Sequence, residues 1–156
     1  MKATKFLLVS ILFAGLTSCN QNEVYFKYQT LPASGWDKDS LKTFNFNITD
    51  TLKAYNLYIN VRHTGSYPYQ NLWLFLDTKD AKGKISRDTI ECFLADQFGK
   101  WLGSGAGSLK EMPVFYKKQI HFPDSGTYQL KIGQGMRDSV LMGVNDVGLK
   151  VETADK

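Results

Sequence analysis

The side chains that could do chemistry in this sequence are few, and their spacing does not bring them together. The histidines, His63 and His121, fall at expected strand ends with no Cys or His at metal-ligand spacing, which is typical of polar strand residues. Four carboxylates are spread over expected turns and strand faces: Asp77, Asp88, Glu91 and Asp96. A glycosidase-like pair among them stays open, because such a pair is defined by its separation in space. No serine has the nucleophile-elbow pattern, and the sequence predicts no enzyme, no metal site and no cofactor.

A glycine-rich stretch from Asp96 to Glu111 reads DQFGKWLGSGAGSLKE. Such loops can bind phosphate, but that use needs a following helix and usually a Lys-Ser/Thr pair. Here a strand-like run from Val114 to Phe122 follows instead. We therefore expect a flexible or tightly wound crossover between two sheets.

Cys19 has the clearest chemistry in the chain. Two lysines precede an apolar run, Phe6 to Leu16, of only 11 residues. A membrane-spanning helix needs about 20, so this run predicts the core of a secretory signal. The run ends in the letters LTSC, which resemble a bacterial lipobox. We expect residues 1–18 to be a signal peptide and Cys19 to carry a lipid; the alternative is an ordinary signal peptide with a chance cysteine.

Processing at Cys19 would leave residues 19–156 as one domain with a sizeable core. Asn20 follows the cysteine with no acidic pair beside it, so nothing here resembles an inner-membrane retention signal or an acidic surface-export run. We expect attachment to the membrane through the lipid on Cys19, at the periplasmic face of the outer membrane.

Processing also changes the charge and the cysteine count. Loss of the two leader lysines lowers the formal charge of +4 by two, so the basic balance does not indicate a nucleic-acid partner. Cys92 is left without a disulfide partner. It shares a strand face with Ile90 and Leu94, which predicts a buried, inert thiol.

The elements that position any binding residue are strands, and the two strongest flank a short loop. Apolar residues alternate with mostly polar ones from Tyr55 to Val61 and from Leu72 to Leu76, which indicates strands with one buried face. The loop from Thr64 to Gln70 makes either a hairpin or a connection between facing sheets. Tyr67 and Tyr69 lie two apart around a proline, so an extended loop would point both rings the same way.

The rest of the chain reads as strands and turns. Further strands are expected over Val24–Leu31, Phe44–Ile48, Ile85–Ala95, Val114–Phe122, Tyr128–Ile132 and Asp146–Glu152. The charged letters KDAKGK, Lys79 to Lys84, predict a hairpin turn. Only Arg137 to Val144 could form a helical turn. About eight strands without an amphipathic helix predict a single antiparallel β-sandwich, immunoglobulin-like or jelly-roll-like.

The segment before Ile132 carries the most fold-specific signal. Asp124-x-Gly126-x-Tyr128 ahead of an alternating strand resembles the tyrosine corner of Greek-key sandwiches, whose hydroxyl bonds back to the backbone. Leu130 stands where an immunoglobulin domain would have its second cysteine, so the likeness is architectural only.

Aromatic residues in loops are the candidates for a binding surface. They are Trp36, Tyr67, Tyr69 and Trp101. Exposed together, such rings could form a sugar-stacking platform or a protein-binding patch, with core packing as the plain alternative. For Trp73, in mid-strand beside Phe75, core packing is the expectation.

Three blocks follow Cys19 in order: VRHTGSYPYQNLWLFL, DTIECFLADQFGKWLGSGAGSL and FPDSGTYQLKIGQGMRDSVLMGVNDVGLKVE. Over nearly the whole mature chain they resemble the GldH-type gliding-motility lipoproteins of the Bacteroidetes. The resemblance implies a small lipoprotein needed for surface gliding, among envelope proteins associated with the motility and type IX secretion apparatus. It carries over no catalytic or ligand-binding residue.

We therefore expect a non-catalytic accessory or scaffolding subunit whose partners are other envelope proteins of the motility apparatus. The alternative, from a different class, is a lipid-anchored carbohydrate-binding β-sandwich module. A coplanar row of exposed aromatic rings would favour the module, and an irregular apolar patch rimmed by polar residues would favour a protein partner.

Overall fold

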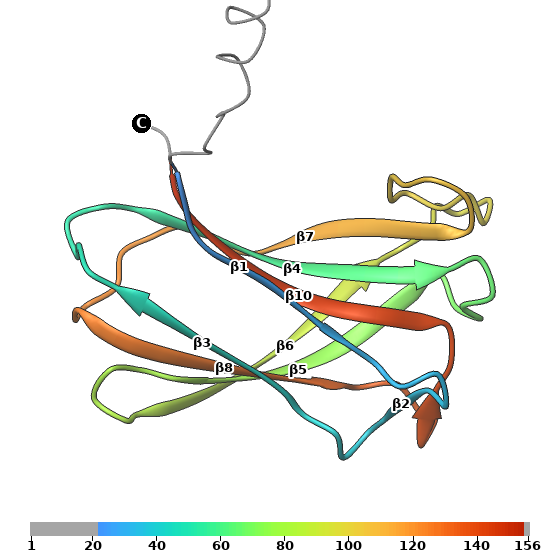
Figure 1. The fold of residues 1–156 in the computed structure, drawn as a ribbon, viewed down its shortest axis with the longest axis horizontal. Helices are drawn as coiled ribbons and strands as arrows, with labels where there is room; N and C mark the ends of the chain where they lie inside the picture. The colour runs from blue at the N-terminus through green and yellow to red at the C-terminus, as the bar shows by residue number, and fades with distance from the viewer. Residues whose placement is uncertain (1–21, 155–156) are drawn as a thin grey trace, which may run out of the picture.

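A computed structural model describes residues 22–154 of the chain (Figure 1). Within them lie ten β-strands and no helix. In chain order the strands are β1 Glu23–Thr30, β2 Trp36–Asp37, β3 Lys42–Ile48, β4 Tyr55–Thr64, β5 Asn71–Lys79, β6 Ile85–Phe93, β7 Leu109–Ile120, β8 Gly126–Gln134, β9 Val140–Leu141 and β10 Val144–Thr153. Over the same residues, no helix is long and apolar enough to cross a membrane.

The strands pair as one long antiparallel ribbon folded back on itself. The first strand pairs with the last, and each later strand with the next one inward: β1 with β10, β2 with β9, β3 with β8, β4 with β7 and β5 with β6. Two more pairings, β10 with β4 and β5 with β8, gather the wound ribbon into the sheets β1-β10-β4-β7 and β3-β8-β5-β6. Nested pairing of this kind makes a jelly roll. The expected antiparallel sandwich is confirmed, in its jelly-roll form (Figure 1).

Alternation along the strands builds the core between the two sheets. Ile59 and Val61 of β4 and Leu72, Leu74 and Leu76 of β5 are fully buried. Because successive side chains of a strand point to opposite faces, burial of these positions sends their neighbours to the outer faces. The same period that predicted the strands therefore fixes which side chains can meet a partner.

The 64–70 loop connects the two sheets and is not a hairpin. β4 pairs with β10 and β7, whereas β5 pairs with β6 and β8, so the chain changes sheets across this loop. The hairpin alternative is thereby excluded. The expected hairpin over Lys79 to Lys84 is confirmed, because β5 and β6 are adjacent antiparallel strands.

Two tyrosine hydroxyls tie loops back to the backbone at one end of the sandwich. Tyr128 donates to the carbonyl oxygen of Asp124 at 2.9 Å, which confirms the expected corner. Tyr55 makes a second such bond, to the carbonyl oxygen of Asp50 at 2.7 Å, that was not expected. The Tyr128 ring also packs 4.6 Å from the ring of Phe122, so each corner is held by packing as well as by a hydrogen bond.

The stretch from Asp96 to Glu111 leads from β6 in one sheet to β7 in the other, so the predicted crossover is confirmed. It is tightly wound at Gly103, where an added Cβ would lie 2.6 Å from the carbonyl oxygen of Glu111. Ser104 and Glu111 exchange two backbone hydrogen bonds, at 3.0 and 2.7 Å. Only a residue without a side chain allows the backbone to approach this closely.

The predicted helical turn between Arg137 and Val144 is wrong. The segment holds β9, in which Val140 is exposed and Leu141 is fully buried. β9 pairs with β2 across the end of the sandwich. Gly143 follows with a φ of 86°, which turns the chain into β10.

Candidate functional site

The outer face of β5 carries two large exposed aromatic side chains. Trp73 and Phe75 are 39% and 45% exposed, while the leucines that alternate with them are fully buried. The expectation that Trp73 packs in the core is therefore wrong. Leu72 and Leu74 occupy the inward positions, and a period of two leaves Trp73 only the outer face.

Glycines of β8 and of the turn after it lie next to these rings. Gly133 pairs with Phe75, and a Cβ added to it would lie 2.7 Å from the Cδ2 atom of Leu41. A Cβ at Gly135 would lie 3.2 Å from the Phe75 ring and 3.3 Å from the Cβ atom of Trp73. Leu41, Trp73 and Phe75 thus pack over glycine backbone, which limits the rotation of these side chains, while their outer surfaces stay exposed to solvent.

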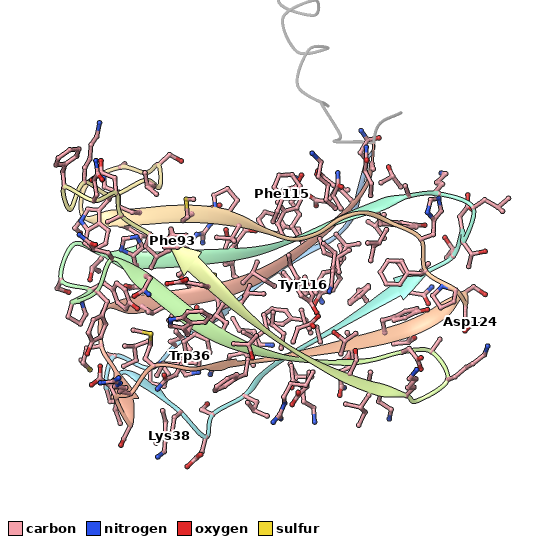
Figure 2. All side chains as sticks on the ribbon, turned by 180° about the vertical axis from the view of Figure 1, so that it is seen from behind. Trp36, Lys38, Phe93, Phe115, Tyr116 and Asp124 are labelled. Carbon is pink, nitrogen blue, oxygen red and sulfur yellow. The ribbon has the colours of Figure 1, made fainter. Side chains whose placement is uncertain are left out.

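Phe93 extends this surface to the end of β6. It pairs with Asn71, two residues before Trp73 on the same face of β5, and is 58% exposed. Figure 2 shows Phe93 toward the end of the sandwich opposite Asp124. Together Leu41, Trp73, Phe75 and Phe93 form a surface that we call the aromatic face.

Polar groups around the aromatic face already have partners. Arg87 holds Asp77 by two hydrogen bonds, from Nε to Oδ1 at 2.6 Å and from Nη2 to Oδ2 at 2.7 Å. These bonds lower the pKa of the Asp77 carboxyl below its ordinary value. Asn71 donates through Nδ2 to Oε1 of Glu91 at 2.5 Å. The rim is therefore ordered and charged, as at the edge of a protein interface.

Two shallow hollows lie beside this face, with Tyr69 and Asn71 lining both. One, of about 380 Å³, is also lined by Trp73, Gly135, Met136 and Arg137. The other, of about 480 Å³, is also lined by Pro68, Gln70, Phe93, Ala95, Asp96 and Gln97. The Tyr69 hydroxyl donates to Oδ2 of Asp138 at 2.7 Å, which fixes the ring on the ridge between the hollows.

Tyr67, in contrast, is buried, so the expectation that it is exposed beside Tyr69 is wrong. Its hydroxyl donates to the carbonyl oxygen of Asn71 at 2.8 Å, and its ring meets that of Tyr69 edge-on at 5.9 Å. The backbone of Tyr67 lies against Gly143, where an added Cβ would come within 2.6 Å of the Tyr67 Cα atom. Tyr67 therefore closes the end of the core and leaves only Tyr69 at the surface.

Trp36 is also buried, which contradicts its expected exposure. It lies in β2, which pairs with β9, and its Nε1 donates to the carbonyl oxygen of Ser40 at 2.8 Å. Figure 2 marks its position. Trp101 is half-buried, with its ring 4.5 Å from the ring of His63. Of the four aromatic candidates, only Tyr69 therefore borders the aromatic face.

His63 is fully buried, so its place is in the core rather than on a polar strand surface. Its Nδ1 lies 3.0 Å from the carbonyl oxygen of Thr64, and Nε2 has no hydrogen-bond partner. Burial lowers the pKa of His63, so the ring is held neutral. Among residues 22–154 no three His, Cys, Asp or Glu side chains are grouped to hold a metal ion.

The thiol of Cys92 is buried, as expected. Burial raises its pKa to about 12, so almost none of it is the reactive thiolate near neutral pH. Cys19 and the predicted signal peptide over residues 1–18 lie outside the described residues.

The outer face of the opposite sheet is different, because charges interrupt its aromatic rings. A row of cross-strand neighbours there places Lys150 beside Tyr58, and Tyr58 beside Phe115. The Lys150 ammonium lies 5.4 Å from the centre of the Tyr58 ring, and the Arg62 guanidinium lies 3.7 Å from that of Tyr28. That face is a mixed polar surface, whereas on the aromatic face Trp73 and Phe75 have glycine backbone on one side and pair with Glu91 and Thr89 on the other.

Fold and surface together define a small jelly-roll domain with an exposed apolar face. A family model described as GldH lipoprotein matches residues 23–151. A gliding motility lipoprotein GldH homolog of Christiangramia forsetii is 38% identical over 96% of this chain and 94% of the relative. The gliding motility lipoprotein GldH of Flavobacterium johnsoniae is 35% identical over the same shares. The chain belongs to the GldH lipoprotein family, whose named members here are gliding motility lipoproteins.

Solved structures give only weak likenesses. The infectious bursal disease virus VP2 subviral particle covers 84% of this chain and 33% of its own, at 16% identity and a TM-score of 0.36. Dimeric latent PorU from Porphyromonas gingivalis covers 85% of this chain and 13% of its own, at 10% identity and a TM-score of 0.37. Likenesses of this size say nothing about the function of this chain.

Proposed function

We propose that this chain is a lipoprotein held through Cys19 at the periplasmic face of the outer membrane. It serves there as a non-catalytic accessory subunit of the envelope machinery for gliding and type IX secretion. In this role the aromatic face receives another envelope protein.

The observation that carries the proposal is the exposure of Trp73 and Phe75 side by side on a sheet face. Contiguous apolar surface with a polar rim marks interaction sites on folded domains. Large aromatic side chains at the centre of such a surface supply most of the binding energy. Because the backbone of Gly135 lies next to the Phe75 ring and the Cβ atom of Trp73, part of the freedom of these side chains is already lost before binding.

The mixed composition of the surface favours a protein over a sugar. Aliphatic Leu41 and Met136 border the aromatic rings, and the rim carries the Arg87–Asp77 pair. A saccharide-binding surface would instead present a row of rings in one plane, with free hydrogen-bonding groups between them. An irregular apolar patch with a satisfied rim fits a protein surface of similar chemistry.

The non-catalytic role is supported by the condition of the groups that could react. Burial keeps the Cys92 thiol protonated and the His63 ring neutral. The Asp77 carboxylate is taken up by Arg87. Cys92 and His63 are thus shut off from solvent, and the Asp77 carboxylate is paired with Arg87.

The proposal is tested by replacing Trp73 and Phe75 together by alanine in cells that glide. Both side chains are on the outer face, so the variant should fold and reach the membrane in normal amounts, while recovery of crosslinked envelope partners and gliding should fall. Phe115→Ala, on the outer face of the other sheet, is the matched control because Phe115 is 53% exposed. Normal partner recovery and gliding in the double variant would reject the proposal. Lost polysaccharide retention with normal partner recovery would favour the sugar-binding alternative.

A further inference from the structure

We infer that Leu52, with Lys53 beside it, contacts the lipid surface next to the acyl anchor and so sets how the domain stands on the membrane. The inference rests on the proposed lipidation of Cys19. It concerns the end of the sandwich where the described chain begins, which the proposed partner surface does not use.

The reach of the chain keeps this end close to the membrane. Cys19 precedes Asn22 by three residues. Three extended residues span at most about 11 Å. An acyl chain on Cys19 would therefore hold Asn22 within that distance of the point where the lipid enters the bilayer.

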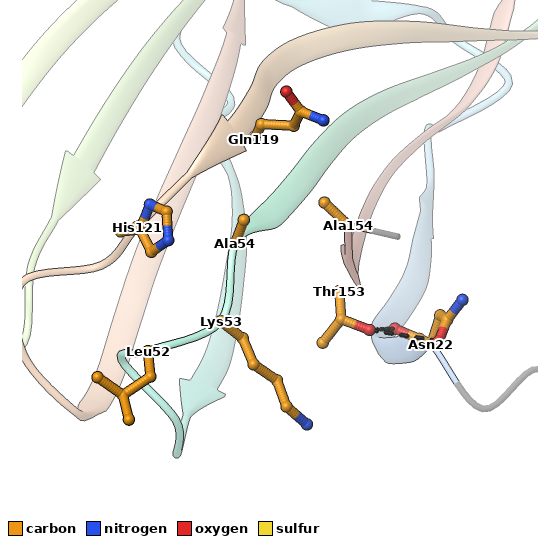
Figure 3. A pocket seen from close by; sticks show the side chains of 8 residues that line it. All are labelled: Asn22, Leu52, Lys53, Ala54, Gln119, His121, Thr153 and Ala154. Carbon is orange, nitrogen blue, oxygen red and sulfur yellow. Dashed lines mark hydrogen bonds between the residues drawn. The ribbon is translucent and has the colours of Figure 1, made fainter. Parts of the chain in front are cut away.

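Leu52 and Lys53 lie at the same end of the sandwich as Asn22. They line a hollow of about 780 Å³ together with Asn22, Thr153 and other residues of the same end (Figure 3). The backbone N–H of Thr153 donates to the carbonyl oxygen of Asn22, and that of Ala154 to the carbonyl oxygen of Ala54, each at 2.8 Å. These bonds join the start of β1, the end of β10 and the 49–54 loop into one unit.

The loop presents Leu52 on a fixed tip. The side chain is 90% exposed. Its backbone N–H donates to Oδ1 of Asp50 at 2.9 Å, and the buried Tyr55 donates its hydroxyl to the Asp50 carbonyl oxygen at 2.7 Å. A lone exposed leucine is ordinary on a protein surface. Leu52 differs because it sits on a rigid loop tip at the end of the domain that the lipid on Cys19 would hold near the membrane.

The charge and exposure of Lys53 also fit a contact with the membrane surface. Its ammonium lies 3.9 Å from Oδ2 of Asp50, and the side chain is more than half exposed. A pair this loose leaves the ammonium free to meet headgroup phosphates. Leucine entering the acyl boundary and lysine staying at the headgroups is the arrangement expected at an interface.

The test places an environment-sensitive fluorophore on L52C in the acylated full chain, reconstituted into vesicles of phosphatidylethanolamine and phosphatidylglycerol. Cys92 does not compete for the label, because its thiol is buried and its pKa is raised to about 12. The matched control is F98C. Phe98 is 85% exposed on the 96–108 crossover, which precedes β7, whereas the 49–54 loop lies near the last residues of that strand.

We expect a blue-shifted emission at position 52 that a quencher on the lipid chains suppresses, and an aqueous emission at position 98. Replacing Lys53 by glutamate should reduce the shift at position 52 in vesicles with phosphatidylglycerol more than in neutral vesicles. Since burying a leucine favours the docked state by about tenfold or more, L52D should free the domain to tumble on its anchor.

An aqueous emission at position 52 in chain shown to be acylated would overturn the inference and leave the proposed function standing. Equal quenching at positions 52 and 98 would also overturn it, because the domain would then have no fixed face toward the lipid. Absence of acylation would overturn the inference together with the anchor.

Discussion

At the scale of single residues, tyrosine hydroxyls that bond to backbone carbonyls hold the loops at both ends of the sandwich. Tyr55 and Tyr128 do so at the end near Asn22, and Tyr67 does so at the other end. Each ring is buried, so each carbonyl depends on a hydroxyl where water has little access.

Tyr128→Phe tests this dependence. The change removes one hydroxyl and leaves the Asp124 carbonyl oxygen without its donor, which should lower the free energy of unfolding by about 1–3 kcal/mol. Urea unfolding of the purified chain measures the loss. Tyr69→Phe is the control, because its hydroxyl bonds to Asp138 at the exposed surface and its loss should change stability far less. Equal stability of Tyr128→Phe and wild type would show that the corner contributes nothing.

His63 predicts how stability depends on pH. Burial lowers its pKa, so the folded protein holds the ring neutral while the unfolded chain takes up a proton near the ordinary value of about 6.5. The unfolded chain then binds more protons, and the free energy of unfolding should fall as the pH drops below about 6.5 and be independent of this group above it.

Urea titrations at about pH 7.5 and about pH 5.5 measure this dependence. His63→Phe, which keeps a ring beside Trp101, should flatten it. An unchanged dependence in His63→Phe would mean that His63 is not its source.

The candidate site could be predicted from the sequence only in part. Alternation along β5 already assigned Leu72 and Leu74 to one face and Trp73 and Phe75 to the other. Core packing is the ordinary outcome for a mid-strand tryptophan, but the alternation along β5 places Trp73 outside. The burial of Trp36 and Tyr67 could not be predicted from the sequence of their loops. Trp36 lies in β2, which pairs with β9, and Tyr67 packs against Gly143, and both partners are distant in sequence.

At the scale of the elements, most strands could be predicted because their periodicity is local. Their pairing could not, since β1 meets β10 and β3 meets β8 across most of the chain. The short strands β2 and β9 cannot be predicted from the sequence, because two residues show no period and each strand forms only by pairing with the other. The 96–111 crossover could be predicted, because a glycine-rich stretch between two strands needs no distant partner to be recognised.

Gly103→Ala tests the tight winding of that crossover. The added Cβ would meet the Glu111 carbonyl oxygen at 2.6 Å, so the hydrogen bonds between Ser104 and Glu111 should weaken. Overpacking of this kind costs about 1–3 kcal/mol. Amide exchange should rise over residues 101–111, and unfolding should need less urea. Gly65→Ala is the control, because the nearest atom to its Cβ would be Nε1 of Trp101 at 3.9 Å. Equal behaviour of the two variants would contradict a tight crossover.

At the scale of the whole molecule, the jelly roll separates two contacts. The start of β1 and the Leu52 loop occupy one end, where the proposed anchor and lipid surface lie. The aromatic face occupies part of the outside of the β3-β8-β5-β6 sheet and reaches toward the opposite end at Phe93 (Figure 2). A domain built this way can be tied to the membrane while its apolar sheet face remains open to a partner.

Partner binding through the aromatic face is tested most directly by photo-crosslinking in living cells. A photoreactive phenylalanine analogue at position 75 should form a covalent adduct with an envelope protein, because Phe75 is 45% exposed within the face. The same analogue at position 115, on the outer face of the other sheet, should give none. Identical adducts from both positions, or no adduct at position 75 in cells that glide, would contradict a partner surface on this sheet.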